Sequence, residues 1–363
     1  MTQFLTMKQL AEELQLSRRV VSAVLNNRSR ELRISEATEK RVREYLESSG
    51  YVRSRSALQL KSKEDNGIIG ILYCGKFIDL EYLTASLGIL TQEIRKLCGF
   101  SEITGVEPDH LYEGVSEFIA KGIRKLIWIH ANTEQEEFTH AEKLFPLFSR
   151  LEKVVIFKFD FLNSEWEETY LSNGVELVGF DSEKSYREAA GILVRAGHRS
   201  VALNEIRQNT GMPLPGNDKL LAAFREAGLT VHGLYPEVEA PSADIPRLIA
   251  ENLANLYWKD GVKAAFIRND LLAAEVMYRL GDYGIRVPDD VALIGFSGSP
   301  YSKWLPVPLT TFEHPIDEMC QCTMSLLKTG KSSGHAQSHI FENKLVLRKS
   351  HGPTKGMKSG GEE

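Results

Sequence analysis

The stretch AAFIRNDLLAAEVMYRLGDYGIRVPDDVALIGF, residues 264–296, predicts the fold class by itself. It begins with a short apolar run over 264–267, continues with a helical pattern over 270–283, and ends with a second apolar run over 291–296. A strand, a helix and a strand in this order form a βαβ unit, in which the two strands are parallel and the helix covers the sheet. An α/β fold with parallel sheets is therefore expected.

The same alternation extends outward through most of the chain. Apolar runs typical of strands alternate with helical patterns throughout residues 67–350. The other expected strands are 68–74, 101–106, 126–129, 154–159, 177–180, 201–204 and 230–235, and the expected helices include 80–97, 110–121, 182–196 and 219–227. A span of this length is enough for two lobes. Because ligands bind at the carboxyl ends of the strands in such sheets, a binding site between the lobes is expected.

Length and composition exclude small disulfide scaffolds and disordered chains, since 363 residues that are 42% hydrophobic can bury large cores. The formal net charge of -5 hides a division of the chain. Residues 1–63 hold 13 Lys and Arg against 7 Asp and Glu, which leaves 31 against 42 for the remaining residues. A basic N-terminal part is thus joined to an acidic body, and a basic part of this kind is typical of proteins that contact phosphates.

The basic part carries three helical patterns. Apolar residues at 7, 10, 11 and 14 predict a first helix, which Thr6 can cap. Ser17 can cap a second helix, with apolar residues at 20, 21, 24 and 25. Ser35 can cap a third, with apolar residues at 42, 45 and 46, which ends near Gly50. Two short helices joined by a tight turn, followed by a third helix, indicate a helix-turn-helix head.

The second helix would present its polar groups to DNA. Arg18 and Arg19 stand at its N-terminal end, where a guanidinium can reach two acceptors of guanine in the major groove. Ser17, Ser22 and Asn26 can donate to phosphates. The alternative is a surface helix that happens to be basic, but the charge excess, the caps and the helix spacing agree with one another.

The runs LTMKQLA at 5–11 and SRRVVSAVLN at 17–26 resemble the DNA-binding head of LacI/GalR-type transcription regulators. The resemblance places Arg18 and Arg19 on variable base-reading positions, while Val20 and Ala23 depart from the usual Thr and Arg. The run RSRSALQLKSK at 53–63 is similar to the family's hinge helix, which enters the minor groove, and a plain flexible linker is the alternative. The residues assigned to DNA contact are Thr6, Met7, Ser17, Arg18, Arg19, Ser22, Asn26, Arg55, Ala57 and Leu60.

The resemblance extends through the body. Its most similar runs are VGFD at 178–181, FIRND at 266–270, VPDDV at 287–291, IGF at 294–296, PLTTF at 308–312 and LVLRKS at 345–350. They imply a two-lobed, periplasmic-binding-protein-like (type I) core with parallel sheets, which closes on a small effector. The domains expected are a helix-turn-helix head over 1–52, a hinge helix and linker over 53–66, an effector-binding and dimerisation core over 67–350, and a disordered tail over 351–363.

The effector site is less sharply defined. Family members that bind sugars commonly have an Arg before the helix expected at 219–227 and an Asp directly after Gly-Phe, and these positions hold Gly216 and Ser297 here. The candidate effector-binding residues are Tyr73, His130, Asn132, Asp160, Gly216, Asn269, Asp270 and Ser297. Polar residues at strand ends also cap helices and close turns. A specialised effector, or none, is left open.

Motifs of catalysis and metal binding are absent from the sequence. Residues 295–299 lack the last Gly of a nucleophile elbow, and there is no P-loop, zinc-protease helix or dinucleotide fingerprint. His335 and His339 lie in a Ser/Gly-rich segment, and Cys320 and Cys322 lie on different faces of an expected helix. No metal and no cofactor are therefore expected, and the cysteines are expected to be buried thiols.

The sequence predicts a homodimeric, sequence-specific DNA-binding regulator and not an enzyme. It is expected to repress transcription from a near-palindromic operator, with an affinity modulated by a small-molecule effector such as a sugar or a related metabolite. One alternative is an effector-independent regulator of the same fold. Another is a solute-binding protein, which would need an export signal, but residues 1–20 contain no long apolar run. A cytoplasmic, nucleoid-associated protein without a membrane segment is therefore expected.

Overall fold

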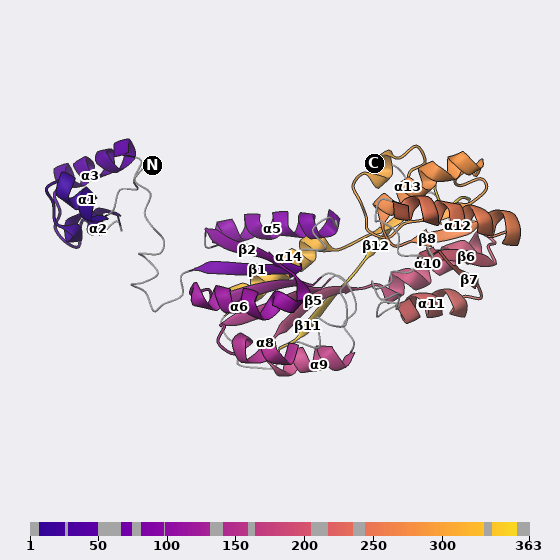
Figure 1. The fold of residues 1–363 in the computed structure, drawn as a ribbon, viewed down its shortest axis with the longest axis horizontal. Helices are drawn as coiled ribbons and strands as arrows, with labels where there is room; N and C mark the ends of the chain where they lie inside the picture. Colours follow the sequence, from indigo (N-terminus) through magenta and orange to yellow (C-terminus); the bar gives the residue numbers. More distant parts are fainter. Residues whose placement is uncertain are drawn as a thin grey trace. The chain divides into compact units, whose positions relative to one another are not determined.

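A computed structural model describes residues 7–25, 28–49, 67–74, 81–97, 99–130, 141–158, 164–204, 217–234, 244–329 and 336–353. The chain divides into two compact units, Met1–Glu64 and Asp65–Glu363. The second unit consists of two lobes, each built on its own parallel sheet (Figure 1).

The first unit contains three helices, α1 (Met7–Glu13), α2 (Arg18–Leu25) and α3 (Glu36–Ser49). Apolar residues from all three form one small core: Leu10, Ala11, Leu14, Val21, Val24 and Val42 are buried. Ser17 Oγ accepts the amide of Val20 at 3.3 Å, and Ser35 Oγ accepts the amide of Thr38 at 3.2 Å. These are the capping bonds that the sequence predicts for the second and third helices. The chain turns sharply between α1 and α2 at Gln15, whose φ is 52°.

The first lobe is built on a six-stranded sheet with the strand order β11-β5-β4-β3-β1-β2. Its strands are β1 (Ile68–Cys74), β2 (Phe100–Val106), β3 (Lys125–His130), β4 (Lys153–Lys158), β5 (Glu176–Asp181) and β11 (Ser338–Glu342). Every pairing between them is parallel. The carboxyl ends of all six strands therefore lie at one edge of the sheet, and their amino ends at the other.

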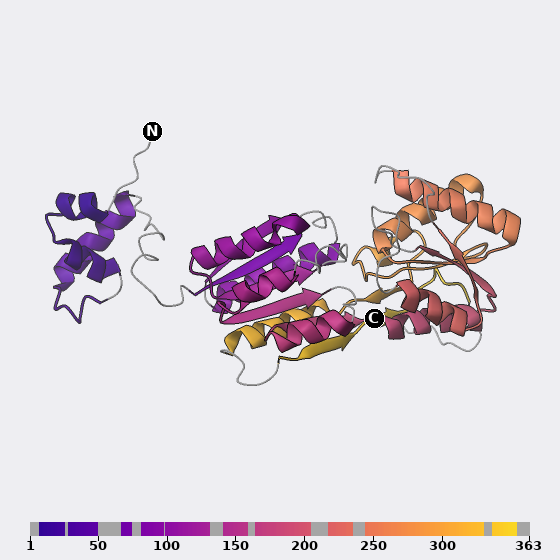
Figure 2. The ribbon, with the colours of Figure 1, turned by 60° about the horizontal axis from the view of Figure 1, so that its bottom comes forward.

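Helices cover both faces of this sheet (Figures 1 and 2). One face packs against α5 (Glu81–Leu97) and α14 (Ile316–Lys328). The other packs against α6 (Leu111–Ala120), α8 (Ala141–Phe148) and α9 (Ser164–Ser172). Along β1, Ile69 and Ile71 point to the first face and Leu72 to the second. Strands buried on both faces in this way form continuous apolar runs, which is the pattern seen in the sequence.

The second lobe is built on a four-stranded parallel sheet with the order β7-β6-β8-β9. The strands are β6 (Ser200–Asn204), β7 (Thr230–Gly233), β8 (Ala264–Ile267) and β9 (Ala292–Ile294). One face packs against α10 (Glu183–Arg195) and α11 (Asn217–Glu226), and the other against α12 (Ile245–Asp260) and α13 (Asp270–Leu280). An antiparallel pair, β10 (Thr311–Glu313) and β12 (Lys344–Val346), completes the lobe.

Within the described residues the chain passes between the lobes three times. It leaves the first lobe after β5, returns between β10 and α14, and leaves again between β11 and β12. Each lobe is therefore assembled from segments that are far apart in the sequence (Figure 2). The predicted parallel α/β architecture is present in both lobes.

The prediction did not include the strands β10, β11 and β12, and its other differences from the structure lie at the ends of elements. The strand expected over 291–296 ends at Ile294, which is the last of its residues to pair with β8. The amide of the next residue, Gly295, bonds instead to the carbonyl of Thr310 at 2.8 Å. The helix expected over 270–283 ends at Leu280 and continues as a 3₁₀ turn, Gly281–Tyr283. The expected hinge helix and most of the expected tail lie outside the described residues. None of the described helices is long and apolar enough to cross a bilayer.

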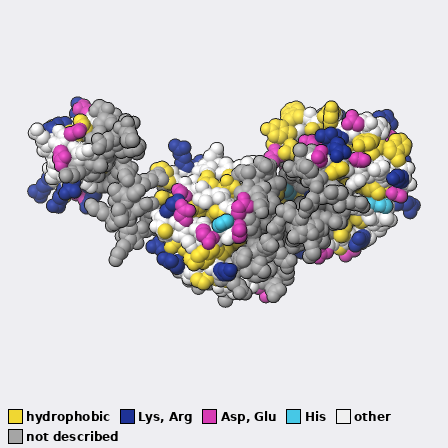
Figure 3. Space-filling model, viewed as in Figure 1, with side chains coloured by type: hydrophobic (Ala, Val, Ile, Leu, Met, Phe, Trp, Pro, Cys, Tyr) yellow, Lys and Arg dark blue, Asp and Glu magenta, His cyan; other side chains and the backbone are white. Residues whose placement is uncertain are grey.

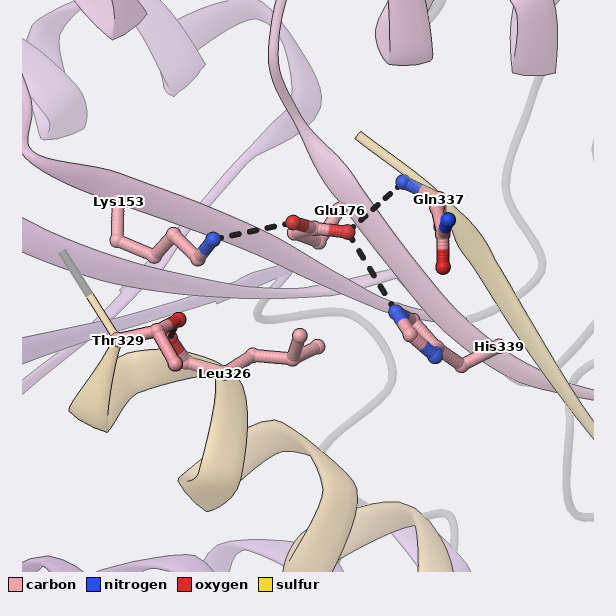
Figure 4. A network of polar contacts seen from close by, with 6 residues as sticks. All are labelled: Lys153, Glu176, Leu326, Thr329, Gln337 and His339. Carbon is pink, nitrogen blue, oxygen red and sulfur yellow. Dashed lines mark hydrogen bonds and ion pairs between the residues drawn. The ribbon is translucent and has the colours of Figure 1, made fainter. Parts of the chain in front are cut away.

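A buried charge cluster lies at the amino edge of the first lobe's sheet, where β1 also begins. Lys153 and Glu176 are the first residues of β4 and β5, and both are only 4% exposed. Their side chains are joined at 3.0 Å between Nζ and Oε1 (Figure 4). Glu176 Oε2 accepts the backbone amide of Gln337 at 2.8 Å and lies 3.5 Å from Nε2 of His339. The carboxylate thus holds β11 in place beside β5.

We predict that this pair is strongly coupled. Removal of one partner leaves a buried charge without compensation, which costs about 3–5 kcal/mol of stability, whereas removal of both charges costs much less. Lys153→Met and Glu176→Gln should each lower the free energy of unfolding by about 3 kcal/mol, and the double variant by less than the sum. Urea unfolding of all four proteins measures this.

The exposed pair Lys96–Glu93, with its charged atoms 2.6 Å apart, is the matched control. The cycle of Lys96→Met and Glu93→Gln should give a coupling below about 1 kcal/mol, because solvent screens the pair. Additive losses at Lys153 and Glu176 would contradict the strong coupling.

Candidate functional site

Asp270 is the centre of the carboxyl edge of the second lobe's sheet. It is the first residue of α13, separated from the end of β8 by Arg268 and Asn269, and its residue surface is 2% exposed. Oδ1 accepts the hydroxyl of Thr311 at 2.7 Å, and Oδ2 accepts the amide of Ser299 at 2.9 Å. One carboxylate therefore connects the start of α13, the loop after β9 and the strand β10.

Burial raises the pKa of Asp270 to about 6, and these hydrogen bonds oppose the rise. The backbone beside the carboxylate fits it closely. A Cβ atom on Gly295 would stand 2.2 Å from Oδ1, so a larger residue at this position would collide with the carboxylate. Gly298 has a φ of +63°, and a Cβ there would stand 2.4 Å from the backbone of Glu313. The loop after β9 therefore has little freedom to change.

Asn269 and Ser297 take part in the same construction. Asn269 Oδ1 accepts the amide of Leu272 at 2.9 Å and so caps α13. Ser297 Oγ accepts the amide of Asp270 at 3.0 Å. Both residues were predicted to bind an effector, and both are placed at the carboxyl edge of the sheet. Each also has the structural role that the sequence left open as an alternative.

The loop after β9 is bonded to the first lobe. Ser299 Oγ donates to Oε1 of Glu81 at 3.1 Å, and Glu81 begins α5, which follows β1. Since Ser299 and Glu81 each follow a strand of their own sheet, the carboxyl edges of the two sheets face each other. This is the place at which a two-lobed α/β protein is expected to bind its ligand.

His314 lies where the three passages between the lobes meet. Its ring stacks on Phe180, at the end of β5, with centroids 4.3 Å apart and an interplanar angle of 13°. Its Nδ1 lies 3.0 Å from Oδ1 of Asn343, which belongs to the third passage. Asn343 Nδ2 in turn donates to Oγ of Ser185, in the first turn of α10 after the first passage, at 3.1 Å. Burial lowers the pKa of His314 to about 4, so the ring is neutral at physiological pH.

The carboxyl edge of the first lobe carries three of the other polar side chains. Tyr73 is half-buried near the end of β1, and His130, at the end of β3, is 4% exposed. Lys158, at the end of β4, is paired in the sheet register with His130 and forms an ion pair with Glu167 of α9. The predicted residues Tyr73 and His130 thus share one edge.

Several predicted residues lie outside the description of the structure. Among the effector candidates these are Asn132, Asp160 and Gly216. Among the DNA candidates they are Thr6, Asn26, Arg55, Ala57 and Leu60, and the side chain of Met7 is not described either. The remaining DNA candidates are placed on or beside α2, where Ser17, Arg18 and Arg19 are exposed and Ser22 is half-buried.

Sequence reasoning did not single out Glu81, Ser299, Thr311, His314 or Asn343. Thr311 lies in a run that was noted for its resemblance, but the run does not indicate which carboxylate its hydroxyl would reach. Contacts between residues 29 or 41 positions apart, such as those of Asp270 with Ser299 and Thr311, depend on the sheet topology and leave no local signal.

Metal and thiol chemistry find no support in the described residues. No group of three or more His, Cys, Asp and Glu among them is placed to hold a metal ion. Cys320 is buried against the first lobe's core, where burial raises the pKa of its thiol to about 12. Cys322 is half-buried, and both are free.

Comparison with known proteins agrees with this fold. Residues 190–351 match the model of a periplasmic binding protein-like domain. The HTH-type transcriptional regulator MalR of Clostridium butyricum is 24% identical over 344 residues, which covers 91% of this chain and 94% of MalR. The HTH-type transcriptional repressor MelR of Bacillus subtilis is 24% identical over 359 residues, covering 96% and 97%.

Solved structures show the same architecture. The Lac repressor dimer bound to operator and the anti-inducer ONPF superposes with a TM-score of 0.73 at 18% identity, covering 97% of this chain and 100% of that one. A LacI family regulator from Lactobacillus casei with bound sucrose gives a TM-score of 0.60 at 19% identity, covering 78% and 99%.

The fold and the facing strand edges define a two-lobed, periplasmic-binding-protein-like core. Nearly the whole chain is similar to HTH-type transcriptional regulators, and its fold is that of the Lac repressor. These relatives are named as transcriptional regulators, in agreement with the prediction that the chain is not an enzyme.

The pKa of Asp270 generates a prediction about stability. A carboxyl group whose pKa is raised on folding binds its proton more tightly in the native state, so its contribution to stability falls as pH rises from about 4 to about 6. In Asp270→Asn the side chain stays neutral. The stability of the variant relative to the wild type should therefore increase over this range, by up to about 3 kcal/mol. Urea unfolding at pH 4, 5, 6 and 7 measures it.

Asp282→Asn, an exposed residue in the 3₁₀ turn after α13, is the matched control and should keep the wild-type pH profile. A difference between Asp270→Asn and wild type that stays constant from pH 4 to 7 would show that the Asp270 carboxyl does not titrate in this range.

Proposed function

We propose that the chain is a sequence-specific DNA-binding repressor that works as a homodimer on a near-palindromic operator. The three-helix unit is its helix-turn-helix head, and residues 53–66 provide the hinge helix and linker. The core over 67–350 binds a small-molecule effector between its lobes and carries the dimer contacts. Such a protein acts in the cytoplasm, on the DNA of the nucleoid.

The observation that carries the DNA-binding proposal is the form of α2. Its buried residues, Val21, Ala23 and Val24, fix one face against the small core, while Arg18 and Arg19 are exposed in the first turn. Two adjacent guanidinium groups at the N-terminal end of an anchored helix are suited to base edges in the major groove.

The charge of the first unit supports the same proposal. Figure 3 shows Lys and Arg side chains gathered at one edge of this unit. Arg28, Arg30 and Arg33 are exposed in the segment between α2 and α3. Their attraction to phosphates is blind to sequence and weakens as salt rises. Recognition of a particular operator therefore depends on α2.

Similar structures support the proposed partners, which are operator DNA and a small-molecule effector. One of them is a Lac repressor dimer bound to operator, and others are LacI family regulators with bound sucrose or lactose. In this chain an effector that bound between the lobes would change their relative positions, and so change the affinity for DNA. A coupling of about 1–3 kcal/mol is typical of such linkage.

Replacement of Arg18 and Arg19 by Ala tests the recognition helix. The double variant should lose its preference for an operator selected from random DNA, because the base contacts are gone, and should keep weak, salt-sensitive binding to any sequence. Fluorescence anisotropy with operator and scrambled duplexes at two salt concentrations measures both properties.

Lys40→Ala, on the exposed face of α3, is the matched control in the same unit and should keep the preference. An unchanged preference in the Arg18→Ala/Arg19→Ala variant would remove α2 from base recognition.

Ser297→Tyr tests the effector site. Added bulk at the carboxyl edge of the second lobe should abolish the effector's influence on operator affinity, while binding without effector stays within about twofold. Ser200→Tyr places the same change at the amino edge of the same sheet and should keep the influence. The measurement is operator release during a screen of small molecules. An equal response in both variants would remove Ser297 from the effector site.

A further inference from the structure

The hydrogen-bond acceptors at the second lobe's carboxyl edge are used within the protein. The carboxylate of Asp270 accepts from Thr311 and from Ser299 and is 2% exposed. Asn269 Oδ1 accepts the amide that starts α13, and Ser297 Oγ accepts the amide of Asp270. A neutral sugar needs acceptors for its hydroxyl protons. The acceptors described at this edge are poorly suited to a sugar, because each already accepts a hydrogen bond from the protein.

The first lobe's carboxyl edge has the same property. Glu81 Oε1 accepts the hydroxyl of Ser299 at 3.1 Å. Asp181 Oδ1 accepts the amide of Glu183 at 2.8 Å and so begins α10. Glu167 is bound by the ammonium group of Lys158, which is 3% exposed. The acidic groups described at both edges therefore already have donors from the protein.

Arg268 supplies a strong donor at this edge. It directly follows β8, and its backbone amide donates to Oδ1 of Asn204, at the end of β6, at 3.2 Å. The residue is 8% exposed, and its Cζ lies 5.7 Å from the ring centroid of Tyr186. Tyr186 is fully buried in α10, the helix that follows the first passage between the lobes. The guanidinium group itself lies over the ring, and this cation–π contact limits where the group can point.

Two properties place Arg268 beside the junction of the lobes. Its charge contributes to the lowered pKa of His314, whose ring lies between Phe180 of the first lobe and Phe296 of the second. Its strand, β8, lies between β6 and β9 in the centre of the sheet. The guanidinium therefore stands at the middle of the edge that faces the other lobe.

A guanidinium is charged at every physiological pH and presents two parallel N–H groups, which match the two oxygens of a carboxylate or a phosphate. We propose that the effector of this regulator carries a carboxylate or a phosphate group, and that Arg268 binds it. The assignment rests on the proposed function, since it names the chemistry of the effector that the proposed function requires.

The test uses the purified full-length chain and four probes at constant ionic strength: inorganic phosphate, glucose 6-phosphate, glucuronate and glucose. Thermal shift is measured for the wild type, Arg268→Gln, Arg268→Lys and the exposed control Arg225→Gln in α11. At least one anionic probe should stabilise the wild type and the control, and glucose should not. Arg268→Gln should weaken that binding at least tenfold, and Arg268→Lys should recover part of it because the charge remains.

The stabilisation caused by each probe is compared with the same variant without probe, so a change in basal stability does not affect the result. Stabilisation by glucose alone, by no probe, or by an anion equally in Arg268→Gln would each overturn the assignment. Operator binding without any probe, measured on the same preparations, tests the proposed function separately. If the protein does not bind operator but an anion still raises its melting temperature in a way that depends on Arg268, the proposed regulatory function is contradicted and the anion site is not.

Discussion

The contact of His314 with Phe180 and Asn343 is the constraint on which the two-lobed structure depends. A chain that passes between two lobes three times could place those passages apart, and the lobes would then have no common axis of motion. Here a residue of the second passage stacks on the end of the first and bonds to the third. Because its pKa is lowered to about 4, the ring is neutral, and Oδ1 of Asn343 can only accept, so Nδ1 carries the proton. A neutral ring adds no charge that would favour one relative position of the lobes by long-range attraction.

The loop after β9 depends on a second constraint, the buried carboxylate of Asp270. An ionised carboxyl group at 2% exposure is costly, which is why its pKa rises, yet it accepts the backbone amide of Ser299 in this loop. The same loop carries Ser299, whose hydroxyl bonds to the first lobe. The buried carboxylate of Asp270 thus lowers the stability of the fold, but it holds the loop whose Ser299 contacts Glu81 of the first lobe. Such a loss of stability is often found at functional sites.

The sequence was sufficient for most of the fold and for less of the site. Apolar runs and helical periods predicted the strands β1 to β9 and most helices of both lobes, because each pattern reflects burial that is local to one element. They did not predict β10, β11 and β12, which are short or only half-buried. The ends of β9 and α13 were wrong by a few residues, since Gly295 and Gly281 end them through contacts that the pattern does not contain. Residues at the carboxyl ends of strands could be named as candidates from topology alone. Their partners could not, because the bonds Asp270–Thr311 and Ser299–Glu81 join positions 41 and 218 residues apart.

Strands β5 and β11 connect the two ends of the first lobe. At their carboxyl ends lie Phe180 and Asn343, which contact His314, and at their amino ends lie Glu176 and His339 in the buried charge cluster. The bond from the Gln337 amide to Glu176 fixes the register of the two strands, so neither can slide past the other without exposing or separating a buried charge. A displacement of one strand against the other would therefore have to break this bond. The amino edge that it reaches is also the edge at which β1 begins. In the function proposed above, this is the edge through which a change at the junction of the lobes would reach the segment proposed as the hinge.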